Sequence, residues 1–321
     1  MLRFLAVALL TLVPLAVGAA TGALAPGIQH YEGRRYEEAR KFFEPHAAKN
    51  PKDADAAFYL GRTLFALRQH EKAAEWLEKA AALAPNRSDV QVELGRAYGQ
   101  AALRANVLRQ AGLAKKTRMA WEKAVALDAN NLEARDLLIQ YYLNAPGFMG
   151  GGVDKARAEA AEIKKRDAVR GHQAFATIAL DQKDPATAER ELKAAIQAAP
   201  ANPRPRLLLA LFYQDQQKWD AAFETLDAIL KANPDNWDAL YQVGRAGALS
   251  GKRLDRAEEC LKRYFGHTPT PEEAPLANAH FRLGQVYEKK GNKAQARAEY
   301  RTALKLDPNL EDAKEALAKL S

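Results

Sequence analysis

Two residues in the last quarter of the chain have the types that nucleophilic catalysis needs. Cys260 precedes His267 by seven positions, and a thiol beside an imidazole can act as a nucleophile with its base. Cys260 also neighbours Leu261 in a helical pattern, which favours a small packing residue, although a free thiol could still pair with another chain. No serine lies in G-x-S-x-G, and no histidine pair has H-E-x-x-H spacing. We therefore predict no enzyme, no metal ion and no cofactor.

A glycine-rich stretch, NAPGFMGGGVDKA at residues 144–156, has the composition of a phosphate-binding loop. Such a loop needs a strand before it and Gly-Lys-Ser or Gly-Lys-Thr at its end, and the G-x-G-x-x-G spacing is also missing here. Helical patterns flank the stretch instead. We predict a lengthened turn, with Pro146 ending the first helix and Asp154 capping the second. The remaining alternative is partner contact through Phe148 and Met149 at the tip.

The elements around these residues recur with a period of 34 residues. Gly27, Gly61 and Gly95 are 34 positions apart, and pairs of alanines and prolines keep the same interval. The clearest copy, residues 58–86, holds two helical patterns, each with apolar residues on one face, and Pro85 ends the second pattern. One such hairpin cannot bury its own apolar faces, so the copies must stack on one another.

This pattern resembles the tetratricopeptide repeat. Residues 280–308 match it almost completely, through Leu283, Gly284, Tyr287, Ala296, Tyr300, Ala303 and Pro308. Eight copies begin near residues 21, 54, 88, 131, 169, 203, 237 and 277. The resemblance implies an all-α fold, a right-handed α-solenoid of about eight helix-turn-helix repeats. Residues 310–320 are expected to form a C-terminal capping helix with one apolar face.

The resemblance also implies a concave groove, lined by the first helices of successive repeats, that receives an extended peptide or a partner helix. Carried over by position, the groove residues are Phe58, Arg62, Phe65, Val92, Arg96, Gln100, Arg135, Ile139, Tyr142, Tyr241, Arg245, Phe281 and Gln285. Arginines among aromatic residues favour a protein partner with acidic and apolar residues. Arg62 and Arg96 hold equivalent positions and could clamp a carboxylate, or they could form internal salt bridges.

The charge of the chain leaves a second function open. The formal net charge is +8, but Lys and Arg alternate with Asp and Glu along the helical stretches, as on solvated helix faces. We therefore predict no nucleic acid partner. The third repeat carries about ten extra helix-forming residues, including Arg104, Arg109, Lys115, Lys116 and Arg118. This basic insertion could instead bind an anionic envelope polymer, such as a glycan or lipid head groups.

The first twenty residues predict export. They combine Arg3, an apolar stretch interrupted by Pro14 and a small-residue end, as in a cleaved secretory signal peptide. We expect residues 21–321 to form the repeat domain, with no transmembrane segment in the mature chain and with a proline-bearing link at 267–275 as a flexible joint. The predicted function is a non-catalytic protein-interaction scaffold in the periplasm, in the cell envelope of a Gram-negative bacterium.

Overall fold

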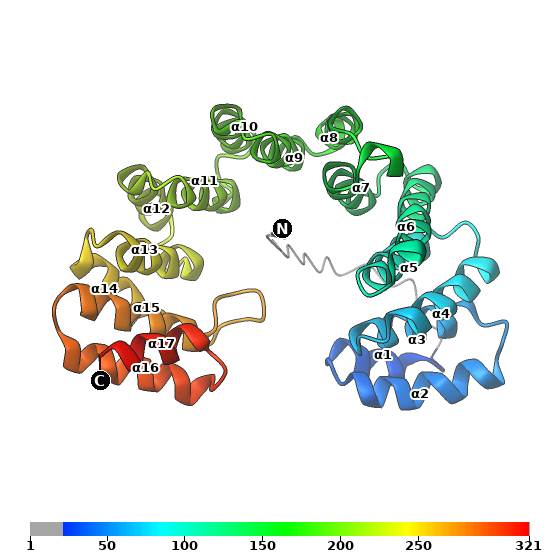
Figure 1. Ribbon diagram of the computed structural model, residues 1–321, viewed down its shortest axis with the longest axis horizontal. Helices are drawn as coiled ribbons and strands as arrows, with labels where there is room; N and C mark the ends of the chain where they lie inside the picture. The colour runs from blue at the N-terminus through cyan, green and yellow to red at the C-terminus, as the bar shows by residue number, and fades with distance from the viewer. Residues whose placement is uncertain (1–21, 321) are drawn as a thin grey trace. The chain divides into compact units, whose positions relative to one another are not determined.

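The structure is a computed structural model that describes residues 22–320, and every regular element in that range is helical (Figure 1). The predicted signal peptide lies outside the described residues. The helices are α1 (Ala25–Glu32), α2 (Tyr36–Lys49), α3 (Ala54–Ala66), α4 (His70–Leu83), α5 (Ser88–Ala102), α6 (Val107–Leu127), α7 (Leu132–Asn144), η1 (Gly147–Met149), α8 (Val153–Arg166), α9 (Ala168–Asp181), α10 (Pro185–Ala198), α11 (Pro203–Asp215), α12 (Trp219–Ala232), α13 (Trp237–Ser250), α14 (Leu254–Tyr264), α15 (Leu276–Lys289), α16 (Lys293–Leu306) and α17 (Glu311–Lys319).

The helices fall into two compact units, whose described parts are residues 22–184 and 185–320. Helices α1 to α9 belong to the first unit and α10 to α17 to the second. Within each unit, every helix packs against the next one along the chain, and the first helices of successive pairs also touch. The all-helical repeat fold is confirmed, because the observed pairs begin within a few residues of the predicted starts.

Short polar loops separate one helical pair from the next and start the following helix. At the start of α3, the side chain of Asp53 accepts a hydrogen bond of 3.0 Å from the N–H of Ala56. Asn131, Asn202 and Asn236 cap α7, α11 and α13 in the same way. A polar residue that satisfies the first free N–H groups fixes where each helix begins.

Glycine allows the two helices of a pair to approach closely. A Cβ atom on Gly61 of α3 would lie 2.6 Å from Cγ of Leu77 in α4. The same atom on Gly244 would lie 2.3 Å from Cγ of Leu261, and on Gly284 it would lie 2.4 Å from the Tyr300 ring. A side chain at these positions would collide with a buried neighbour, which explains the glycine found there.

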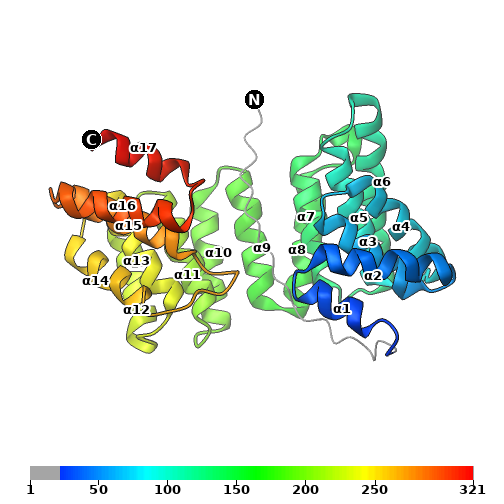
Figure 2. The same cartoon turned by 90° about the horizontal axis from the view of Figure 1, so that it is seen from below.

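Two predicted departures from the regular repeat are observed. The extra residues of the third repeat lengthen its second helix, so that α6 has 21 residues while α4 has 14. At the other end, α17 packs against α16 (Figure 2). It buries Ala313 and leaves its charged residues exposed to solvent, as a capping helix should. The expected capping helix is therefore confirmed.

The glycine-rich stretch is a turn between α7 and α8, as expected, but its cap differs from the prediction. Helix α8 starts at Val153 with Gly152 at the N-cap position, so Asp154 lies inside the first turn and is not the cap. Gly152 has a φ of 151°, which excludes an ordinary side chain at the cap. Gly151 packs so closely on the Ala145 carbonyl that a Cβ would lie 1.8 Å from its oxygen.

The proline-bearing link at 267–275 lies inside the second unit, whereas the boundary between the units falls at Pro185. Within the link, Nε2 of His267 lies 2.8 Å from the Glu273 carboxylate, and the Tyr264 hydroxyl donates to the Ala274 carbonyl at 2.7 Å. The flexible joint stays a prediction. Across residues 22–320, none of the helices is both long and apolar enough to cross a lipid bilayer.

Candidate ligand-binding surface

The predicted groove residues divide by exposure and by unit. Nine of them lie in the first unit and four in the second. The side chains of Phe58, Val92, Arg135, Ile139, Tyr142, Tyr241 and Phe281 are buried. Partly or fully exposed side chains are those of Arg62, Phe65, Arg96, Gln100, Arg245 and Gln285. Only this second group can meet a ligand without a rearrangement of the helices.

Three of the buried residues come from α7, where the prediction was one position out of register. Tyr142 occupies in α7 the place that Tyr98 occupies in α5, because the hydroxyl of each donates to a glutamate of the helix before it. Arg135 and Ile139 therefore lie on the packing face of α7. In α7, the positions that correspond to the predicted groove residues of α3 and α5 are Asp136 and the residues that follow it at intervals of about one helical turn.

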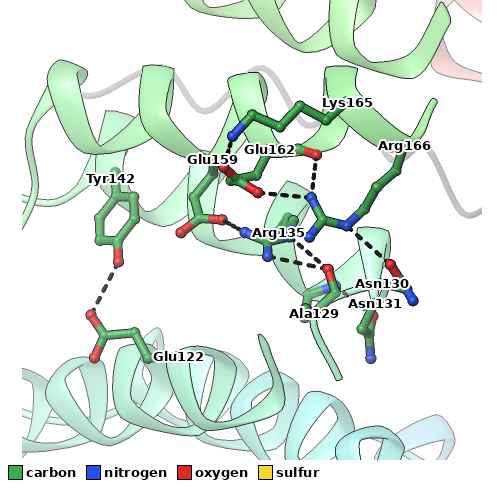
Figure 3. A network of polar contacts seen from close by, with 11 residues as sticks. Glu122, Ala129, Asn130, Asn131, Arg135, Tyr142, Glu159, Glu162, Lys165 and Arg166 are labelled. Carbon is green, nitrogen blue, oxygen red and sulfur yellow. Dashed lines mark hydrogen bonds and ion pairs between the residues drawn. The ribbon is translucent and has the colours of Figure 1, made fainter. Parts of the chain in front are cut away.

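Arg135 stabilises its own repeat and is not free for a ligand. Its Nε and Nη2 atoms donate to the Ala129 carbonyl at 3.2 and 3.1 Å, and its Nη1 atom pairs with Glu159 of α8 (Figure 3). Close by, Nε of Arg166 donates to the Asn130 side chain at 3.1 Å. These contacts connect α7, α8 and the loop before α7, so Arg135 acts as an internal tie.

Arg62, one half of the predicted clamp, is held among aromatic rings. Its guanidinium lies 4.7 Å from the centre of the Tyr31 ring, and its Nε atom lies 3.6 Å from the Glu93 carboxylate. Burial lowers the pKa of Arg62, but the neighbouring Tyr31 and Glu93 outweigh it and the pKa is raised overall. The guanidinium therefore stays charged, although Nε has no hydrogen-bond partner among the described residues.

Arg96, the other half, continues a row of alternating charges. Its guanidinium lies 3.5 Å from the same Glu93 and also pairs with Glu133 of α7. We call the four residues Arg62, Glu93, Arg96 and Glu133 the charge ladder, because they connect α3, α5 and α7 in sequence. One further contact lies beyond the ladder, where Nε of Arg170 in α9 donates to the Asp136 carboxylate of α7 at 2.6 Å.

Arg62 and Arg96 form internal salt bridges, which was one of the two predicted arrangements. The two ends of the charge ladder differ in their exposure to solvent. The side chains of Arg62 and Glu93 are only 16% and 15% exposed, whereas those of Arg96 and Glu133 are 28% and 42% exposed. An exposed ion pair contributes little stability, and breaking a buried one is costly. A ligand carboxylate could therefore replace Glu133 at Arg96 far more cheaply than it could reach Arg62.

In the second unit the arginine that follows the crossing glycine Gly244, as Arg96 follows Gly95, bonds to an uncharged side chain of the preceding first helix. Nη1 of Arg245 in α13 donates to the Gln214 side chain of α11 at 2.6 Å. Tyr241 packs against Tyr264, with ring centres 5.7 Å apart. Arg245 is thus a partly exposed cation on a first helix of this unit, with a neutral amide as its partner.

The residues first considered for nucleophilic chemistry are not arranged for it. Cys260 is fully buried, and burial raises the pKa of its thiol to about 11, so the thiolate form is disfavoured near neutral pH. His267 stacks on Trp237, with ring centres 4.6 Å apart, and contacts Glu273. Within residues 22–320, His, Cys, Asp and Glu form no group of three that could hold a metal ion.

Sequence reasoning missed a repeated contact between a tyrosine and a glutamate. A tyrosine near the end of a first helix donates its hydroxyl to a glutamate of the preceding second helix. The four pairs are Tyr98 with Glu78, Tyr142 with Glu122, Tyr213 with Glu189, and Tyr287 with Glu258. We call these pairs the Tyr–Glu ties. They occur in both units, and the recurring tyrosine was the sequence signal that could have revealed them.

Comparisons with known proteins agree with this architecture. Three family models, each described as a tetratricopeptide repeat, match residues 24–88, 179–246 and 277–310. No curated protein matches the chain. A tetratricopeptide repeat protein from Parabacteroides merdae is a similar solved structure, with 16% identity, a TM-score of 0.51 and coverage of 83% of this chain and 98% of that one.

A second similar structure is the human IFIT1 dimer with m7Gppp-AAAA. It has 18% identity and a TM-score of 0.55, and the match covers 92% of this chain and 71% of that one. At these identities the likeness shows the fold alone. The three family matches together span more than half of the 321 residues, and the helical pairs keep the same repeat on both sides of the unit boundary. The chain therefore belongs to the tetratricopeptide repeat proteins.

Proposed function

We propose that this protein is a non-catalytic scaffold of the bacterial cell envelope that binds a protein partner on the first helices of its first unit. Repeats of this family generally mediate protein–protein interaction through their extended inner surfaces. The observation that supports this assignment most directly is the charge ladder, whose exposed end joins Arg96 and Glu133 across two adjacent repeats.

The exposed end of the ladder suits a segment with an acidic and an apolar residue. Arg96 can exchange Glu133 for a carboxylate of the partner, and a guanidinium binds a carboxylate with two parallel hydrogen bonds. Phe65 and Gln100 are partly or fully exposed on α3 and α5, and they supply an apolar contact and an amide. Arg62 holds the neighbouring helices in place and does not bind the ligand itself.

The basic insertion offers less support for an anionic polymer. Arg109 pairs with Glu71 at 3.0 Å, Lys116 with Glu78 at 3.1 Å and Arg118 with Glu122 at 2.9 Å. These carboxylates offset much of the positive charge that a polymer would have to find there. Polymer binding is kept as an outcome of the test.

Affinity capture from envelope extracts tests the proposal with a matched pair of variants. Arg96→Glu places a second carboxylate beside Glu133 and should abolish capture of the protein partner. Lys116→Glu makes the same change of charge on α6 and should leave capture intact. Loss of capture only in Lys116→Glu would favour the polymer, and unchanged capture in both variants would refute a role for the ladder. Far-UV circular dichroism confirms that both variants are folded.

The proposed location has its own test. The full-length chain is expressed in a Gram-negative host with an epitope at its C terminus, and the cells are separated into periplasmic, cytoplasmic and membrane fractions. We expect the protein in the periplasmic fraction, with an intact mass that corresponds to removal of about the first 20 residues, within the usual length of a signal peptide. An unprocessed chain in the cytoplasm would refute export but would leave the interaction proposal standing.

A further inference from the structure

An open depression of about 490 Å³ lies at the start of α4, at the turn that joins α3 to α4. It is lined by the turn itself, by the first residues of α4 and by the end of α5, which brings Arg104 beside Arg68 and Lys72. These cations belong neither to the charge ladder nor to the Tyr–Glu ties. The depression is therefore a separate feature of the first unit.

The start of α4 leaves several backbone donors without an acceptor. Helix α4 has 14 residues, and Gln69 at its N-cap position makes no side-chain hydrogen bond to the helix. The first backbone hydrogen bond of the helix runs from the Ala73 N–H to the Gln69 carbonyl at 2.9 Å. The N–H groups of the first turn thus point out of the helix end, where its dipole favours a negative charge.

The second observation is a buried polar side chain that lacks a partner. His70 lines the depression, is only 9% exposed and packs against Phe65 with ring centres 5.1 Å apart. Its Nδ1 atom is buried and has no hydrogen-bond partner among the described residues. A buried polar atom without a partner costs free energy, and a ligand in the depression that His70 lines could supply the missing hydrogen bond.

We propose that this depression is a phosphate-binding site, in which the first-turn N–H groups of α4, the imidazole of His70 and the side chains of Arg68, Lys72 and Arg104 surround a phosphate group. Donors from several directions suit a tetrahedral oxyanion better than a planar carboxylate. The one acidic residue of the lining, Glu71, is paired with Arg109 at 3.0 Å, which reduces its repulsion of an anion.

The positive charges around the His70 imidazole favour the binding of an anion in the depression. Burial lowers the pKa of His70, and the positive charges of Arg104 and Arg68 lower it further. A bound anion would offset these two cations and raise the pKa again. Because the two equilibria are linked, an anion that raises the pKa of His70 must also bind more tightly when His70 is protonated.

The test follows the His70 ring by two-dimensional NMR while inorganic phosphate is added to the full chain at constant ionic strength. We expect saturable shifts of the His70 signals and a higher His70 pKa, with no change at His280, which is paired with Glu299 in the second unit. Sulfate, which does not titrate near neutral pH, should act like phosphate. No saturable shift with either anion, or an equal response to acetate, would overturn the proposal.

Charge-neutral variants separate the site from general attraction. Arg104→Gln and Lys72→Gln should each weaken phosphate binding about tenfold, the loss expected for one charge-assisted hydrogen bond. Lys115→Gln removes the same charge from an exposed position of α6 outside the depression, and it should have no effect. Equal weakening in all three variants would mean that only net charge matters, which would overturn a defined site.

The phosphate could come from solution or from a lipid head group, and vesicles distinguish the two. Co-sedimentation with phosphatidylglycerol vesicles, but not with phosphatidylcholine vesicles, that disappears in Arg104→Gln would assign a head group. Phosphate binding without co-sedimentation would assign the free anion. Both results support the site. It shares no residue with the exposed end of the charge ladder, so failure of either proposal leaves the other intact.

Discussion

Helix α5 carries two glycines one turn apart, and the structure predicts opposite effects when each becomes alanine. A Cβ on Gly95 would lie 2.3 Å from Nε1 of Trp121, a buried ring whose Nε1 donates to the Val92 carbonyl at 3.1 Å. The ring must move by about 1 Å or more to restore ordinary contact distances. Overpacking costs about 1–3 kcal/mol, and a buried N–H without its acceptor costs about 1–3 kcal/mol.

Alanine also favours the helix over glycine by about 1 kcal/mol, which offsets part of this cost. Gly95→Ala should therefore lower the free energy of unfolding by about 1–5 kcal/mol, when the overpacking and hydrogen-bond costs are combined with that gain. Gly99 is the matched control. Its added Cβ would lie 3.6 Å from the Thr117 methyl group, an ordinary contact, so Gly99→Ala keeps the helical gain of up to about 1 kcal/mol.

Urea denaturation followed by far-UV circular dichroism measures both variants against the wild type, and tryptophan fluorescence reports the displaced ring. Gly95→Ala and Gly99→Ala should change the free energy of unfolding in opposite directions. If the two variants changed stability equally, or if Gly95→Ala were at least as stable as the wild type, the contact between α5 and α6 would not be what selects glycine at this crossing.

Four further predictions concern single side chains. Gln217 has a φ of 55°, in the left-handed region, so Gln217→Gly should raise the free energy of unfolding by about 1 kcal/mol. Its neighbour Gln216 has a φ of −82°, so Gln216→Gly should lower the free energy of unfolding by about 0.5 kcal/mol. Equal effects of the two variants in urea denaturation would contradict this prediction. Tyr213→Phe removes one Tyr–Glu tie and should cost about 1 kcal/mol. Two lysines and this tyrosine lower the pKa of Glu189 to about 2. The stability that ionised Glu189 contributes is therefore present above its unfolded pKa near 4.5 and is lost as the pH falls toward 2. The free energy of unfolding should depend less on pH in this range in Glu189→Gln, and an unchanged pH dependence would contradict the assignment. Burial raises the pKa of Cys260 to about 11, so a thiol reagent at pH 8 should react only after unfolding in urea, and rapid labelling of the folded protein would contradict its burial.

The helical pairs could be predicted because the signals for them are local. A small residue at the crossing of the two helices, apolar residues around it and a proline or capping residue in the loop all lie within 34 residues. Four starts were placed at residues 54, 88, 203 and 237, where α3, α5, α11 and α13 begin. Each of these properties acts on the chain near its own position, so no knowledge of distant contacts was needed.

The fourth repeat shows where local signals fail. Ile139 occupies the position in α7 that Gly61 and Gly95 occupy in α3 and α5, and Arg135 occupies that of a small packing residue, Ala57. Without a glycine to mark the crossing, the register moved by one residue, and one residue of a helix turns side chains by about 100°, from a packing face to a groove face. Burial of Arg135 requires Glu159 and the Ala129 carbonyl, which only the folded chain brings together.

The charge ladder and the Tyr–Glu ties differ in what they imply about function. The ties recur in both units at one packing position, through pairs such as Tyr98 with Glu78 and Tyr287 with Glu258, so they serve the stacking of repeats in general. The ladder depends on oppositely charged residues facing one another between adjacent first helices, whereas the equivalent arginine of the second unit, Arg245, meets a neutral amide. A feature that stacking alone does not require is the better candidate for recognition, which is why Arg96 is the residue on which the capture experiment is centred.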